Sequence, residues 1–140
     1  MRGPKNPMRT QLPDPDMLKS RHHALLSLRL RFHDEARLGP GKIALLEAVR
    51  TSRSVAKAGA SMDMSARRAW LLIDSLNNAF VEPLVALSDP AQPGASEATL
   101  TQLGEELVGA YRAVEDDAAQ SVKRRFTALQ ERLRRPPDQP

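Results

Sequence analysis

Apolar residues recur at steps of three and four positions near the C-terminal end of the chain. Because an α-helix turns once in about 3.6 residues, this spacing predicts one nearly straight helix with a single apolar stripe. The helix is expected to run from Thr101 to about Arg134, where Pro136 and Pro137 end it. The stripe consists of Leu103, Leu107, Tyr111, Val114, Ala118, Val122, Phe126, Leu129 and Leu133.

A helix of this length extends beyond the small domain that the rest of the chain can form. It rises by about 1.5 Å per residue, so the residues after about Tyr111 leave that domain and expose an apolar patch. Pairing with the same helix of a second copy around a two-fold axis buries the patch. We therefore expect a homodimer whose interface contains Val114, Ala118, Val122, Phe126, Leu129 and Leu133.

Charge favours an antiparallel arrangement of the two helices in this dimer. An acidic stretch in one copy would face a basic stretch in the other. Exposed ion pairs choose an orientation more than they add stability, since each contributes about 0 to 1 kcal/mol. The acidic residues are Glu105, Glu106, Glu115, Asp116 and Asp117, and the basic residues are Lys123, Arg124, Arg125 and Arg132.

Residues 26–33 alternate between apolar and polar side chains, which predicts a half-buried strand with a basic outer face. Glycine and proline at residues 39–41 then break the chain, and residues 42–51 have apolar side chains at helical spacing. These residues predict the first helix. The inward positions of the strand are Leu26, Leu28, Leu30 and Phe32, and the outward ones are Ser27, Arg29, Arg31 and His33.

Two short helices joined by a turn are expected next. Ser54 is a suitable N-cap for a helix over residues 55–58, which a left-handed turn at Gly59 would end. After a connector at residues 62–64, Ser65 can cap a second helix that runs to about Ala79. This pair predicts a helix-turn-helix.

A hairpin is expected after the second helix. Residues 84–87 and 98–100 predict two short strands around a loop rich in proline and alanine. Such a hairpin is a wing, and the early strand could complete its sheet. The predicted fold is therefore mainly α with a small β-sheet: a winged helix-turn-helix plus a long C-terminal dimerisation helix. The expected domains are a flexible basic arm (1–24), the DNA-binding domain (25–100), the dimerisation helix (101–135) and a tail (136–140).

The second helix of the pair carries the candidate DNA-binding residues. Projection at about 100° per residue places Ala69, Ile73, Leu76 and Phe80 inward and leaves the opposite side to solvent. Arg67 is the candidate reader of a guanine edge, and Leu71 can contact a thymine methyl. The alternative is a simple solvated face. The full predicted set is Ser54, Ser65, Arg67, Arg68, Leu71 and Asp74, with Arg68 and the two serines placed for phosphate.

Charge and composition narrow the function classes. Lys and Arg number 21 against 17 Asp and Glu, and the formal charge of +4 favours a partner such as double-stranded DNA. The sequence has no cysteine, no glycine-rich phosphate loop and no plausible zinc cluster among its histidines. We therefore expect no catalytic site, no metal and no cofactor. No apolar run reaches the roughly 20 residues of a membrane span, and the N-terminus lacks a signal peptide, so a cytoplasmic, non-membrane protein is expected.

Four segments resemble the N-terminal DNA-binding domain of molybdate-responsive, ModE-type regulators, and more distantly the winged helix-turn-helix of LysR-type regulators. The resemblance covers roughly residues 25–120 and implies a dimeric regulator whose helix from Ser65 reads DNA. The segments are GPGKIALLEAV (residues 39–49), MSARRAWLLIDSLN (64–77), EPLV (82–85) and ATLTQLGEELVGAYRAVE (98–115).

Two departures from that family shape the expected function. The family's wing is usually glycine-rich, whereas this loop has only Gly94, which puts wing contacts with DNA in question. Full-length members also carry C-terminal oxyanion-binding domains, so no direct molybdate binding is expected from these 140 residues. The alternative function is a helical protein–protein interaction module without specific DNA binding. Salt-dependent retention on DNA distinguishes the two, because counterion release makes DNA affinity fall with added salt.

Overall fold

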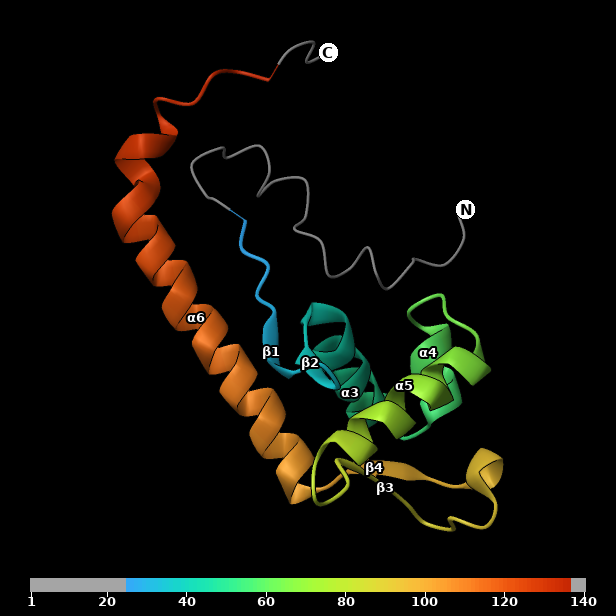
Figure 1. Cartoon of the computed structure of the whole chain (residues 1–140). Helices are drawn as coiled ribbons and strands as arrows, with labels where there is room; N and C mark the ends of the chain where they lie inside the picture. The colour runs from blue at the N-terminus through green and yellow to red at the C-terminus, as the bar shows by residue number, and fades with distance from the viewer. Residues whose placement is uncertain (1–24, 137–140) are drawn as a thin grey trace.

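The computed structural model describes residues 25–136 as a mainly helical fold with two small antiparallel sheets (Figure 1). The expected arm at 1–24 and the tail residues 137–140 lie outside the described residues. No helix in the described part is long and apolar enough to cross a membrane. The elements are β1 (Leu30–His33), β2 (Ala36–Leu38), α3 (Pro40–Ser52), α4 (Val55–Ala60), α5 (Ala66–Ala79), β3 (Val85–Leu87), the 3-10 turn η1 (Pro93–Ala95), β4 (Ala98–Leu100) and α6 (Gln102–Gln130).

The first strand differs from its prediction in length and in partner. It covers Leu30–His33 alone and pairs with β2. The hairpin predicted as a wing, which keeps that name below, forms a separate sheet from β3 and β4. A bulge between Arg31 and His33 interrupts the alternation, so Phe32 is 62% exposed and does not face the core. Leu26 also lies at the surface, whereas Leu28 packs against the core.

The core lies where α3, α4 and α5 meet. Proline at the start of α3 suits the first turn of a helix, where its missing N–H costs nothing. The stripe predicted at residues 43, 46 and 49 is buried. The inner face of α5 is buried as predicted, except that Phe80 follows the end of the helix and is half-buried. The core is completed by Leu84, Val85 and Ala98 at the base of the wing. The fully buried members of the three helices include Ile43, Leu45, Leu46, Val49, Val55, Ala58, Ala69, Ile73 and Leu76.

The prediction that Gly59 ends α4 in a left-handed turn is wrong. The helix continues to Ala60, and Asp63 has the positive φ in the connector. Gly59 is instead a close contact between helices, because a Cβ there would lie 2.6 Å from the Cβ of Ala69 on α5. The absent side chain lets α4 and α5 pack tightly.

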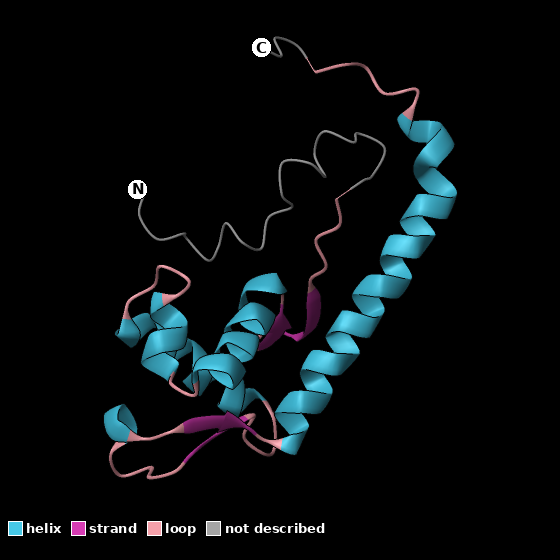
Figure 2. Cartoon of the chain, turned by 180° about the vertical axis from the view of Figure 1, so that it is seen from behind, coloured by secondary structure: helices cyan, strands magenta, loops and turns pink. Residues whose placement is uncertain are grey.

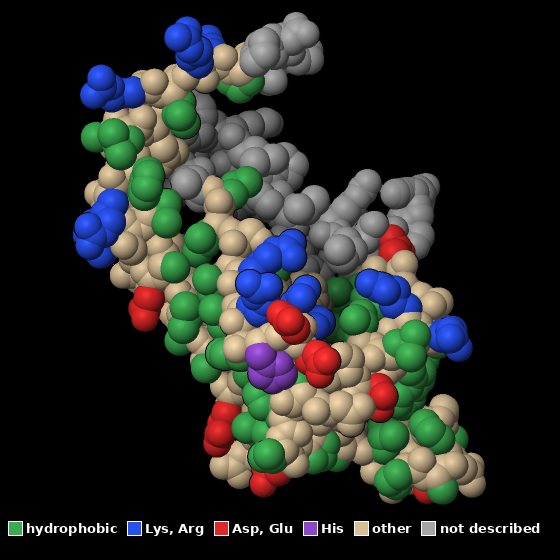
Figure 3. Space-filling model, in the orientation of Figure 1, with side chains coloured by type: hydrophobic (Ala, Val, Ile, Leu, Met, Phe, Trp, Pro, Cys, Tyr) green, Lys and Arg blue, Asp and Glu red, His purple; other side chains and the backbone are tan. Residues whose placement is uncertain are grey.

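Helix α6 extends beyond the rest of the described structure, as predicted (Figure 2). Thr101 caps its first turn by accepting a hydrogen bond from the backbone N–H of Gly104 at 3.0 Å. Val108 and Tyr111 are buried against the core, and further along the same side apolar residues come to the surface (Figure 3). The exposed fractions are 43% for Val114, 48% for Phe126 and 53% for Leu129, while Ala118 and Val122 are half-buried.

The predicted extension of this helix to Arg134 is wrong. Regular α6 ends at Gln130, and the backbone N–H groups of Arg132 and Leu133 donate three residues back, to the carbonyls of Leu129 and Gln130. Such tightening is typical of a fraying last turn. Pro136 disfavours helical backbone at the preceding residue, so the helix ends before it. Leu133 is consequently 73% exposed and lies outside the helical stripe.

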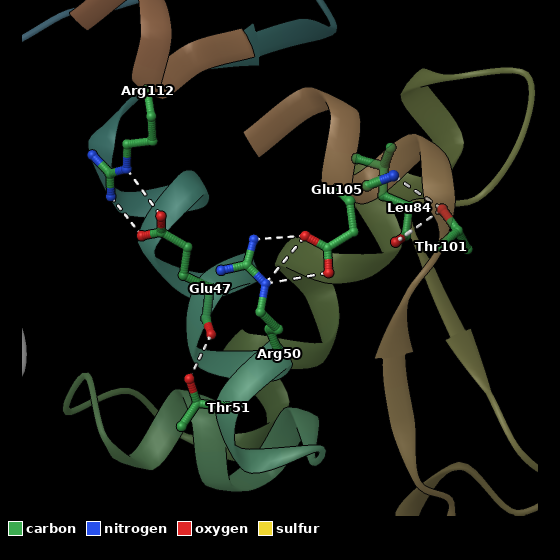
Figure 4. Close-up of polar contacts among 8 residues, drawn as sticks. Glu47, Arg50, Thr51, Leu84, Thr101, Glu105 and Arg112 are labelled. Carbon is green, nitrogen blue, oxygen red and sulfur yellow. Dashed lines mark hydrogen bonds and ion pairs between the residues drawn. The ribbon is translucent and has the colours of Figure 1, made fainter. Parts of the chain in front are cut away.

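Two arginine–glutamate contacts fasten α6 to α3 (Figure 4). Arg50 binds Glu105 at 2.7 Å, and Arg112 binds Glu47 at 2.5 Å. Arg112 also binds Glu115 on its own helix at 2.6 Å, and hydrogen bonding to Glu47 is the main reason its pKa is raised. Glu105 and Glu115 are thus engaged within the chain, so the antiparallel dimer prediction rests on Glu106, Asp116 and Asp117 among its acidic residues.

Candidate nucleic-acid interface

The turn between α4 and α5 sets the direction of α5. Both serines predicted as caps have this role: the Oγ of Ser54 accepts from the backbone N–H of Lys57 and that of Ser65 from Arg68, each at 3.1 Å. A serine hydroxyl that accepts a bond can still donate its own proton. Each cap therefore keeps one donor that can bind a phosphate oxygen.

The outward face of α5 carries the side chains predicted to contact DNA. Arg67, Arg68, Leu71 and Asp74 are all exposed, and Leu71 has 56% of its surface in solvent. Among residues 25–136, neither arginine forms an ion pair, so both guanidinium groups are available to an external anion. The helix thus brings five of the six predicted residues onto one element, with Ser54 at the start of α4 as the exception.

A groove separates α5 from the wing. Trp70 lines it and is half-buried against the core. The groove places Arg67 of α5 beside the wing. Its lining residues are Arg67, Trp70, Leu71, Ile73, Asp74, Asn77, Val85, Leu87 and Pro93.

Asn77 fixes the base of the wing, a role that the sequence analysis missed. Its Oδ1 accepts from the backbone N–H groups of Leu84 and Val85 at 2.8 and 3.1 Å, and its Nδ2 donates to the Val85 carbonyl at 3.2 Å. The backbone N–H of Thr101 donates to the Leu84 carbonyl at 2.9 Å. The one sequence signal for this role was the position of Asn77, whose amide side chain adjoins the inner face of α5.

Arg53 joins the wing to the end of α3. It caps α3 in a left-handed conformation with φ of 60°, and its carbonyl accepts from the Ala98 N–H at 2.9 Å. Its Nε donates to Glu97 at 2.6 Å, and this hydrogen bond holds the pKa of the Glu97 carboxyl below its ordinary value. The charge of Arg53 is therefore already matched within the chain.

The described residues do not contain a group of three or more histidine and carboxylate side chains that could hold a metal ion. His22 and His23, which the sequence analysis rejected as ligands, lie outside this range. Of the acidic run at the middle of α6, Glu115 is engaged with Arg112.

No protein-family model matches the chain. It is 33% identical to the molybdenum-pterin-binding protein MopB of Rhodobacter capsulatus over 84 residues, which are 60% of this chain and 31% of the relative. It is 35% identical to the molybdenum transport protein ModE of Azotobacter vinelandii over 97 residues, 69% of this chain and 34% of the relative. For the molybdenum-pterin-binding protein MopA of Rhodobacter capsulatus the identity is 30% over 91 residues, 65% of this chain and 34% of the relative. The chain thus spans about a third of the length of these relatives.

Proposed function

We propose that this chain is a sequence-specific, double-stranded DNA-binding transcription regulator of the ModE type, with no catalytic role. In this proposal α4 and α5 form the helix-turn-helix, and β3 and β4 form the wing. The observation that carries it is the outward face of α5, which exposes Arg67, Arg68 and Leu71 while caps and core packing fix its direction. The relatives named for molybdenum binding or transport support a link to molybdenum-dependent control.

The dimensions of α5 suit the major groove. Its 14 residues span about 21 Å, and B-DNA offers a groove about 12 Å wide that admits a helix. The first turn of such a helix approaches the base edges, which assigns base reading to Arg67 and a thymine-methyl contact to Leu71. Arg68 and the hydroxyls of Ser54 and Ser65 are assigned to phosphate.

We further propose a homodimer formed through the exposed stripe of α6. The stripe continues the side that packs on the core, so one helix serves both the domain and the second copy. A two-fold pair sets two copies of α5 at a fixed spacing and predicts a palindromic site.

A second candidate is a helical protein–protein interaction module. The observation that favours it is the same apolar stripe, since Phe126 and Leu129 expose about half of their surface. In that case α6 would bind another protein, and the exposed arginines of α5 would be a solvated face.

Selection of DNA sites by the full chain tests the proposal. The chain is incubated with a random duplex pool, bound sites are enriched, and affinity is measured across salt concentrations. We expect an enriched palindromic sequence and a steep fall in affinity with salt. Retention without enrichment contradicts sequence-specific binding, and the absence of retention favours the interaction module.

Two variants then test the assignment of the reading residue. Arg67→Ala should weaken binding to the enriched site by about 1 to 3 kcal/mol and relax the base preference at one position, because a base-edge contact is removed. Arg68→Ala is the matched control on the same turn and should weaken all sequences alike. An unchanged ratio of specific to unrelated affinity in Arg67→Ala would contradict its role as reader.

A further inference from the structure

We propose that the β1–β2 hairpin is the principal phosphate-binding element beside α5, with Arg31, Arg37 and Lys42 contacting the sugar-phosphate backbone. The inference rests on the proposed DNA-binding function and adds a surface to it. In this arrangement the wing lies against the duplex without binding phosphate through cations, and the β1–β2 hairpin provides the cationic side chains.

The register of the hairpin places two positive charges directly opposite each other. Leu30 pairs with Leu38 and faces the core, whereas Arg31 pairs with Arg37 on the other face. Like charges in directly opposite positions destabilise a strand pair. The pair therefore costs stability in the free protein, and a bound anion between or above the two side chains relieves that cost.

The surrounding contacts leave this charge available. The nearest carboxylate to Arg31 is that of Asp34 at 3.9 Å, and both side chains are largely exposed, at 66% and 88%. Such a contact is worth little. Lys42 donates from Nζ to the backbone carbonyl of Arg37 at 3.0 Å, which brings a third cation to the same place. Within residues 25–136, Arg37 and Lys42 form no ion pair.

The two hairpins lie on opposite sides of α5. Arg37 and Lys42 line a small cleft together with Ser75, Ala79 and Phe80 of the helix. The wing meets Trp70, Asp74 and Asn77 instead. At about 100° per residue, these two sets project from opposite flanks of α5, and the face with Arg67 and Leu71 lies between them.

The two hairpins differ in net charge. Residues 29–42, which contain the β1–β2 hairpin, have four Lys and Arg side chains against the carboxylates of Asp34 and Glu35, a formal charge of +2. The wing segment, residues 83–100, contains Asp89 and Glu97 and has no lysine or arginine. Arg53 at its base is held by Glu97. In Figure 3 a cluster of Lys and Arg side chains lies at the centre of the view with acidic side chains beside it, whereas the wing at the lower right shows no Lys or Arg. A duplex seated on α5 has one backbone on each side of the major groove, and phosphate neutralisation supplies much of the affinity. The cationic flank is the hairpin.

Salt titrations of three full-length proteins test the inference. Arg31→Gln/Arg37→Gln is compared with the wild type and with Arg134→Gln/Arg135→Gln, which removes the same charge beyond the far end of α6. Each lost phosphate contact lowers the slope of log affinity against log salt by about 0.9, so the hairpin variant should lose about 1.8. Enriched and unrelated DNA should weaken by the same factor, and the control should keep the wild-type slope.

The outcomes separate this inference from the function it rests on. A wild type with steep salt dependence and an unchanged slope in the hairpin variant overturns the inference and leaves DNA binding intact. A wild type that does not bind DNA removes both. If the hairpin variant forms a weaker dimer and its salt slope is unchanged, the arginines of the hairpin bind acidic residues of a second copy. That outcome also overturns the inference. Lys42→Gln, expected to lower the slope by about 0.9, provides a second variant should the double variant fold poorly.

Discussion

Tyr111 is the residue that ties α6 to the segment before β1. Its side chain is 1% exposed, and its hydroxyl donates to the carbonyl of Leu28 at 2.6 Å across 83 positions of sequence. Burial raises the pKa of this phenol above its ordinary value of 10.0. The residue therefore joins α6 to the first residues of the described structure with a single neutral hydrogen bond.

Tyr111→Phe should lower the free energy of unfolding at pH 7 by about 0.5 to 1.5 kcal/mol, because one hydrogen bond is lost while the ring remains. The raised pKa gives a second signature. The unfolded phenol ionises first, so the stabilisation from the neutral phenol is complete below pH 10 and is lost as pH rises through the folded pKa. Urea unfolding from pH 7 to 11 measures both effects. An equal alkaline loss in wild type and variant would contradict the assignment.

The role of a residue could be predicted where its partners are close in the sequence. It could not be predicted where the fold brings the partners together. Ser54 and Ser65 were identified as caps because a cap acts on an N–H three positions along the chain. Asn77 binds backbone groups seven and eight positions away, through a fold that the sequence does not display. The exposure of Arg67 followed from helical projection. Its contact with a base stays a prediction.

At the scale of elements, the crossing of α4 and α5 depends on Gly59. Gly59→Ala should destabilise the protein by about 1 to 3 kcal/mol, because the new methyl group overlaps the Cβ of Ala69 and forces the helices apart. Gly109→Ala is the matched control in α6, where the new Cβ would meet no atom within 4 Å apart from its chain neighbours and its own helix backbone. That change should stabilise the helix by about 0.5 to 1 kcal/mol. The melting temperatures of the two variants are compared with that of the wild type. An equal change in both would contradict the packing role of Gly59.

The four helices were predicted and one strand was not, for a physical reason. Each helix has a local signal in its cap or its apolar spacing. Strand β2 has three residues, too few for alternation to stand out, and it forms because Ala36 and Leu38 find a place in the core beside β1. The bulge at Phe32 is likewise fixed by that pairing. The early strand was therefore placed too long and in the wrong sheet.

At the scale of the whole molecule, the exposed stripe of α6 predicts the oligomeric state. Phe126→Asp/Leu129→Asp should convert a dimer to a monomer, because two buried apolar contacts become charged. Both residues lie beyond the core, so the monomeric domain should still fold and keep its helical circular dichroism spectrum. Gln120→Asp/Thr127→Asp introduces the same charge on the other side of the helix and should leave the dimer intact. Sedimentation of the variants at micromolar concentration is the measurement; a wild type that sediments as a monomer refutes the interface.

The two arginine–glutamate contacts between α3 and α6 have a mechanical consequence. They join α6 to α3, so in the proposed dimer the junction of these two helices acts as the fixed end of a lever. The 29 residues of α6 span about 43 Å. A rotation of the helix by about 10° about one end therefore displaces the opposite end by about 7 Å. That is about two base-pair steps along DNA. In the proposed dimer on DNA, small changes in the angle at which the two α6 helices cross would therefore decide which half-site spacing is accepted.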